Sequence, residues 1–172
     1  MTAAQKILSP FLARVAIVLV AIVVACGTVP PAAAQSTPKA VQFNIDGKGL
    51  LLRGYDPVAY FKTGAPVKGD PQWTVTHKGA TLYFASDANR DAFAAAPDKY
   101  LPAYGGFCAY GVASGYKVDG DPAVWKIVDG KLYLNIKKSV GQTFSADPAR
   151  YIQQAERKWP QMRDKTPTEV NK

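Results

Sequence analysis

The chain has 172 residues with 21 Lys and Arg, 13 Asp and Glu and a single His, which gives a formal net charge of +8 at pH 7. This length fits one domain of ordinary size behind a targeting segment. The basic residues are scattered and never form a run of five. The charge therefore indicates a solvated basic surface, and we expect no nucleic-acid partner.

Residues 1–34 have the pattern of a secretory signal peptide. Lys6 and Arg14 supply the positive region, the run Val15–Ala25 is apolar, and Ala32-Ala33-Ala34 offers the small side chains that a signal peptidase needs. The apolar run is shorter than the ~20 residues that cross a bilayer. We therefore predict cleavage after this segment and a periplasmic or secreted protein.

A second processing route gives an alternative localisation. Val23-Val24-Ala25-Cys26 is similar to a bacterial lipobox, in which a lipid on Cys26 would anchor the protein to a membrane. Under ordinary cleavage Cys26 is lost, and Cys108 is then the only thiol of the exported chain. An unpaired Cys in an exported protein is a reactive thiol, an intermolecular partner, a ligand or a small buried hydrophobe.

The rest of the chain divides into a lead-in, one domain and a tail. Residues 35–40 form a short flexible lead-in, and residues 41–163 form the domain. Residues 164–172 are polar and lack apolar periodicity, so we predict a disordered tail. No linker divides the domain, and we recognise no internal repeat.

The domain is predicted to alternate short strands with short helices. In chain order we expect a strand at 41–45, a brief helix from Asp56-Pro57, a hairpin of 73–77 and 80–84, a helix capped by Ser86 with a further turn from Pro97, a hairpin of 124–128 and 131–136, and a last helix from Asp147-Pro148. This order predicts a small α+β domain with an antiparallel sheet built from hairpins, rather than repeated βαβ units.

Several of these segments carry motifs that resemble the YHS domain family. The run Lys78–Ser86, followed by Phe93 and Pro97-Asp98-Lys99-Tyr100, is similar to the strand, helix and closing element of that family, and Asp56-Pro57-Val58 is similar to its opening motif. Residues 40–162 as a whole resemble the exported, stand-alone YHS-domain proteins of bacteria, through the segments 104–111 and 125–135. The resemblance implies a YHS-like α+β fold and a link with metal handling.

The cysteines that many members of this family carry are absent here. Ala59 and Ala85 stand in their places, and the helical position is polar around Asn89. The remaining candidate ligands are Cys108 and His77, whose thiolate and imidazole suit a soft or borderline ion such as Cu(I) or Zn(II). We expect copper to be the metal if one is bound, through Cys108, with His77 as a weaker partner and Met162 as a conceivable third ligand.

Two other functions are compatible with the same segment. The aromatic residues around Cys108 are able to line an apolar pocket for a small ligand or a protein partner, without any metal; they are Tyr104, Phe107, Tyr110 and Tyr116. A Cys–His enzyme with Asp56 orienting the base would need a lowered thiol pKa. No catalytic signature surrounds Cys108, so we expect a binding or accessory protein of the bacterial envelope rather than an enzyme.

Overall fold

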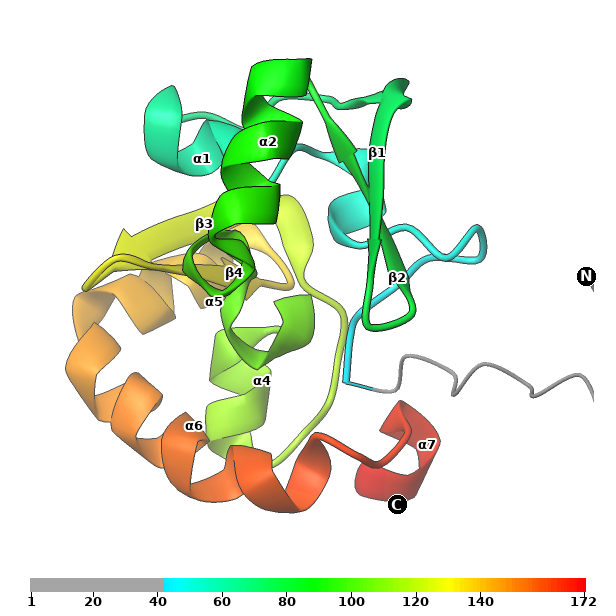
Figure 1. Cartoon of the computed structure of the whole chain (residues 1–172). Coiled ribbons are helices and arrows are strands. Elements are labelled where there is room, and N and C mark those ends of the chain that lie inside the picture. Colours follow the sequence, from blue (N-terminus) through cyan, green and yellow to red (C-terminus); the bar gives the residue numbers. More distant parts are fainter. Residues whose placement is uncertain (1–41) are drawn as a thin grey trace, which may run out of the picture. The chain divides into compact units, whose positions relative to one another are not determined.

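The computed structural model of the chain describes residues 42–172, so the predicted signal peptide, Cys26 and the lead-in lie outside the described residues. The elements are α1 (Ala59–Lys62), β1 (Asp70–His77), β2 (Ala80–Phe84), α2 (Asp87–Ala95), α3 (Pro97–Tyr100), α4 (Ala109–Ser114), β3 (Asp121–Val128), β4 (Lys131–Asn135), α5 (Lys138–Ala146), α6 (Pro148–Met162) and α7 (Pro167–Val170), with 3₁₀ turns η1 (Leu52–Gly54) and η2 (Ala103–Gly106) (Figure 1). The predicted α+β class is confirmed. Within the described residues, no helix is both long and apolar enough to cross a membrane.

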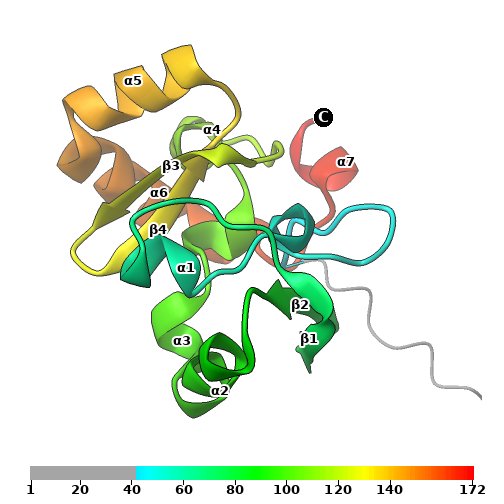
Figure 2. The same ribbon diagram turned by 90° about the horizontal axis from the view of Figure 1, so that it is seen from above.

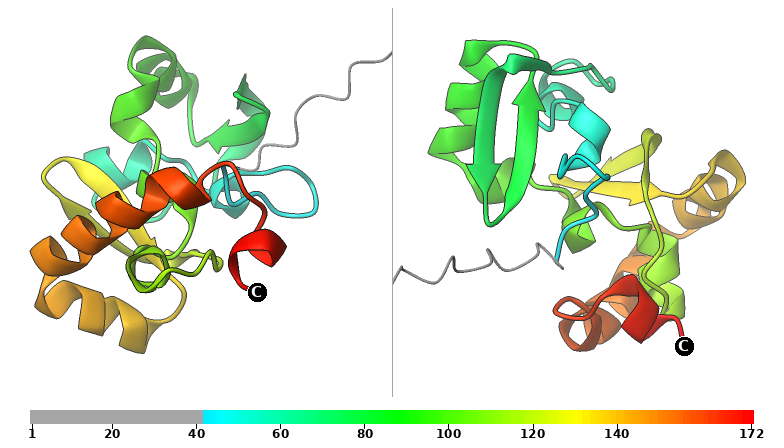
Figure 3. Two further views of the ribbon diagram at one scale, coloured as in Figure 1. Left: turned by 90° about the horizontal axis from the view of Figure 1, so that it is seen from below. Right: turned by 90° about the vertical axis from the view of Figure 1, so that its right-hand side faces the viewer.

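The strands form two separate antiparallel hairpins, β1–β2 and β3–β4, which share no sheet (Figures 1 and 3). Both hairpins were predicted from their turn residues. Lys78-Gly79 and Asp129-Gly130 have positive φ at both central positions, which is the turn geometry that matches the twist of paired strands. The strand predicted at 41–45 is reduced, within the described residues, to an isolated bridge between Ile45 and Leu51.

The two hairpins belong to an internal repeat, contrary to our expectation that the domain has none. Asp70 pairs with Phe84 and Asp121 pairs with Asn135, and in each hairpin the register shifts before pairing resumes. The two hairpins and the helices after them correspond at a separation of 51 residues, with identical side chains at several positions: Gly69 and Gly120, Asp70 and Asp121, Pro71 and Pro122, Gly79 and Gly130, Phe93 and Phe144, Pro97 and Pro148, Tyr100 and Tyr151. Each repeat is thus a hairpin, a helix and a second helix that begins at Pro.

In each repeat the helix that follows the hairpin buries a phenylalanine, and the two phenylalanines lie in different core clusters. Phe93 of α2 lies in the cluster beneath the first hairpin, which also receives Leu132 and Leu134 from β4. Phe144 of α5 lies in the second cluster, among side chains of α4, α6 and Tyr133. Helix α2 accordingly packs beside β1–β2, whereas α5 packs beside β3–β4 and α6 runs along α4 (Figures 2 and 3).

The C-terminal residues, for which composition predicts disorder, are held by a buried lysine. Lys117 is fully buried, and its Nζ donates hydrogen bonds to the carbonyl oxygens of Met162, Arg163 and Lys165 at 3.3, 2.9 and 2.6 Å. The side-chain amide of Asn171 binds the backbone N–H and C=O of Lys117. Because Lys117 lies far from the tail in sequence, local composition gives no sign of this anchor.

Burial lowers the pKa of Lys117 from its ordinary value of 10.5 to about 8. Between pH 8 and 10.5 the unfolded chain therefore retains a proton that the folded chain has lost, so this group makes folding more favourable as pH rises through that window. We predict that denaturant midpoints of the wild type increase from pH 8 to 10 relative to those of Lys117→Met. Parallel pH profiles of the two proteins would contradict this.

Candidate ligand groove above Cys108

The structure places His77 at the end of β1, against the first core. Its ring meets Phe93 edge-on with centroids 5.8 Å apart, and within residues 42–172 its Nε2 is buried with no hydrogen-bond partner. Burial lowers the pKa of His77, and the nearby Lys78 acts in the same direction. The neutral imidazole is therefore favoured, which is the form that binds metals.

Cys108 lies at the start of α4, with only 1% of its surface exposed. Its Sγ accepts a hydrogen bond from the N–H of Gly111 at 3.3 Å and donates to Oδ1 of Asn135 at 3.7 Å. Burial raises the pKa of the thiol, although the N–H groups of Gly111, Ile136 and Tyr110 act the other way. The environment thus favours a neutral thiol, unlike that of a catalytic cysteine.

The contacts described for His77 and for Cys108 share no residue, so the structure does not join them into one site. Asp56 is bound to backbone N–H groups and Asn89, and Met162 is buried in the second core. Among residues 42–172 no group of three or more His, Cys, Asp or Glu is arranged to hold a metal ion.

The internal repeat gives Cys108 a counterpart, which is Asp56. The separation is 52 residues here, because the segment between α4 and β3 is one residue shorter than that between α1 and β1. The backbone N–H of Asp56 donates to the carbonyl of Val67 at 2.9 Å, and that of Cys108 donates to the carbonyl of Val118 at 2.9 Å. Both side chains are buried acceptors for N–H groups of the short helix that follows.

In the first repeat a polar network lies beside this acceptor. Nδ2 of Asn89 donates to Oδ2 of Asp56 at 2.6 Å, and Nζ of Lys62 donates to Oδ1 of Asn89 at 3.0 Å. In the second repeat the positions of Asp56, Asn89 and Lys62 are occupied by Cys108, Val140 and Ser114. The second repeat therefore lacks the charges of Asp56 and Lys62 and the side-chain amide of Asn89.

An open apolar groove of about 270 Å³ lies at this place in the second repeat. Its lining contains no charged residue, and it includes Cys108, Tyr110, Ser114, Tyr116, Ile136 and Val140. Tyr116 and Ile136 are 54% and 42% exposed, and they are the exposed large hydrophobic residues of the described part of the chain. We refer to this feature as the Cys108 groove.

Only part of the predicted aromatic pocket contributes to the groove. Tyr110 and Tyr116 line it, whereas Tyr104 and Phe107 are 5% and 3% exposed and belong to the second core. The Tyr104 hydroxyl donates to Oε1 of Glu156 at 3.2 Å. Sequence reasoning missed the other lining residues of the groove, among them Ser114, Ile136 and Val140, whose counterparts are found by aligning the two repeats.

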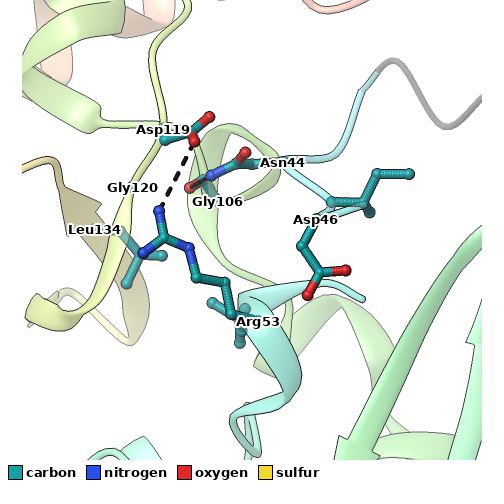
Figure 4. A pocket seen from close by; sticks show the side chains of 9 residues that line it. Asn44, Asp46, Arg53, Gly106, Asp119, Gly120 and Leu134 are labelled. Atoms are coloured by element: carbon teal, nitrogen blue, oxygen red, sulfur yellow. Dashed lines mark hydrogen bonds and ion pairs between the residues drawn. The ribbon is translucent and has the colours of Figure 1, made fainter. Parts of the chain in front are cut away.

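A second hollow lies between η1, η2 and the start of β3, and it is shown in Figure 4. It holds only about 50 Å³, enough for one or two water molecules. The Arg53 guanidinium points toward the carboxylate of Asp119, 3.7 Å away, and the carboxylate of Asp46 lies apart from it (Figure 4). Asp46 instead accepts hydrogen bonds from the backbone N–H groups of Lys48 and Leu50. The guanidinium is paired with Asp119, and the hollow is too small for an organic ligand.

Comparison with known proteins assigns no family: no family model matches the chain, and neither a curated protein nor a solved structure matches it. The resemblance to YHS-domain proteins therefore remains an expectation from sequence motifs.

The raised pKa of the Cys108 thiol predicts slow alkylation. With iodoacetamide, the rate for the folded protein is expected to rise only above pH 9, the ordinary pKa of the group. The same chain in denaturant, where the thiol is ordinary, is the control. A folded-state rate that is already maximal near pH 7 would contradict this and would favour a Cys-dependent enzyme.

Proposed function

We propose that this chain is an exported, non-enzymatic binding or accessory protein, of YHS type, that holds a small uncharged apolar ligand in the Cys108 groove. One observation carries the proposal. The second repeat has an open groove with an uncharged lining at the positions where the first repeat has the hydrogen-bonded side chains of Lys62 and Asn89. The signal-like residues 1–34 support export.

The lining of the groove defines the chemistry of the ligand. Ligand pockets commonly measure ~300–1,000 Å³, so a groove of about 270 Å³ suits a molecule the size of one or two small rings. The absence of charged residues from the lining disfavours ions, because a buried charge would lose its hydration without gaining a partner. The two exposed hydrophobic side chains at the rim gain burial when a ligand is bound.

Grafting the first repeat onto the second tests this proposal. In the triple variant Cys108→Asp, Ser114→Lys, Val140→Asn the groove receives the side chains that form the polar network of the first repeat. We predict that residues 35–172 bind the uncharged probe N-phenyl-1-naphthylamine with enhanced fluorescence, and that the triple variant loses at least about tenfold in affinity, which corresponds to ~1.4 kcal/mol.

The matched control is Gln153→Ala, an exposed residue of α6 that does not line the Cys108 groove. It is expected to bind the probe as the wild type does. Equal probe binding by the triple variant and the wild type, with both proteins folded by circular dichroism, would refute the proposed site.

A second candidate function is binding of a soft metal ion, for which Cys108 supplies a thiol at the lining of an open groove. Since the structure gives Cys108 and His77 no common contact, His77 is not needed in this alternative. We predict that Cu(I) titration distinguishes the two functions. A tight site lost in Cys108→Ala and retained in His77→Ala would favour copper, whereas equally weak binding by all three proteins would exclude it.

A further inference from the structure

A second groove lies between the strand β3 and the helix α5, and it differs from the Cys108 groove in chemistry. It has a volume of about 540 Å³ and is lined by both polar and apolar side chains, among them Trp125, Asn135, Lys138, Gln142 and Ser145. Asn135 lines this groove but not the Cys108 groove. We refer to it as the Asn135 groove.

Asn135 is 1% exposed, and within residues 42–172 only the oxygen of its side-chain amide takes part in hydrogen bonds. Its Oδ1 accepts hydrogen bonds from the N–H of Tyr110 at 3.2 Å and from the Cys108 thiol at 3.7 Å. No hydrogen bond from Nδ2 occurs within residues 42–172. Among residues 42–172, Nε2 of His77 is the only fully buried polar side-chain atom without a partner. Nδ2 of Asn135 therefore meets solvent at the groove, where an acceptor of a ligand is able to replace water.

The first repeat shows that the fold does not require a polar side chain here. The position of Asn135 is occupied there by Phe84, which is fully buried in the first core. The corresponding position of the first hairpin is therefore compatible with a buried apolar side chain. The amide of Asn135 is therefore a specific feature of the second repeat.

The helix α5 also differs from α2 in the side chains that it presents at this groove. The positions of Gly141 and Gln142 correspond to Arg90 and Asp91, which form an ion pair at 2.8 Å on the first repeat. A Cβ atom at Gly141 would lie 2.7 Å from Cγ1 of Val124, so α5 approaches β3 closely at this glycine. Lys138 is the only charged residue of α5 that lines the groove.

We propose that the Asn135 groove is a carbohydrate site that takes a pyranose ring. A pyranose combines a face of C–H groups with hydroxyls around its edge. Trp125 and Val124 offer apolar surface for such a face, and the amide of Asn135, the amide of Gln142 and the hydroxyl of Ser145 offer neutral hydrogen-bonding groups for the hydroxyls. Lys138 is the one charged residue of the lining. This site is independent of the proposed function of the Cys108 groove.

Nuclear magnetic resonance titration of ¹⁵N-labelled residues 35–172 tests the proposal, with N-acetylglucosamine, methyl glucoside and galacturonate as probes up to tens of millimolar. We expect saturable shifts of the Trp125 indole N–H and of the side-chain amides of Asn135 and Gln142 with at least one sugar. Tighter binding of the anionic galacturonate than of the two neutral sugars would indicate that the charge of Lys138 contributes to binding.

Two variants assign the binding to the groove. Asn135→Asp keeps an acceptor for Tyr110 but removes the donor, and is expected to weaken the sugar by about tenfold, the effect of one hydrogen bond. Gln142→Ala changes an exposed side chain and is expected to weaken it by a few-fold without affecting folding. Val140→Asn, in the Cys108 groove, is expected to leave sugar binding unchanged.

Either of two results would overturn the proposal: shifts that do not saturate with any of the three sugars, or saturable shifts that Gln142→Ala leaves unchanged. If Asn135→Asp fails to fold, Gln142→Ala and the identity of the shifted resonances still decide the outcome.

Discussion

A buried acceptor at the start of a short helix holds each half of this domain together. In the first repeat the acceptor is the carboxylate of Asp56, which binds N–H groups of Val58 and Ala59 at α1 and of Ala85 just after β2. In the second repeat it is the sulfur of Cys108, which binds the N–H of Gly111 and also interacts with that of Ile136, just after β4. In each repeat one side chain therefore accepts hydrogen bonds both from the short helix that follows it and from the end of the hairpin.

The difference between the two acceptors explains where the molecule has open surface. A carboxylate attracts further donors, and Asn89 and Lys62 complete a network that closes the first repeat. A neutral thiol makes weaker hydrogen bonds, and Val140 and Ser114 supply no such network. The second repeat keeps the backbone arrangement but presents two open grooves, the apolar Cys108 groove and the Asn135 groove, which has both polar and apolar lining. Under the proposed function, both candidate binding grooves belong to the second repeat.

Local signals in the sequence predicted the elements that depend on neighbouring residues. The two hairpins followed from their turn dipeptides, and α2 followed from Ser86, whose Oγ accepts a hydrogen bond from the N–H of Asn89 at 3.2 Å. Helix α5 was missed, because Gly141 and the β-branched residues Val140 and Thr143 weaken its helical signal. Its formation depends on packing, with Phe144 fully buried.

Features that depend on residues distant in sequence were not predictable in the same way. The tail is ordered by Lys117, and the repeat is obscured because its two copies retain few identical side chains. Cys108 was singled out in the sequence as an unpaired thiol, but its sequence neighbourhood did not reveal that His77 packs against Phe93 of the first core. The grooves themselves arise from substitutions that are visible only when the repeats are compared in space.

The central claim is that the second repeat has an open apolar site where the first has a closed polar one. Xenon binds in apolar cavities that exclude water, so a crystal of residues 35–172 under xenon pressure tests whether the Cys108 groove offers such an apolar site. We predict a xenon atom between Cys108, Tyr110 and Val140, and none at Asp56. Xenon at Asp56, or none beside Cys108, would contradict this account.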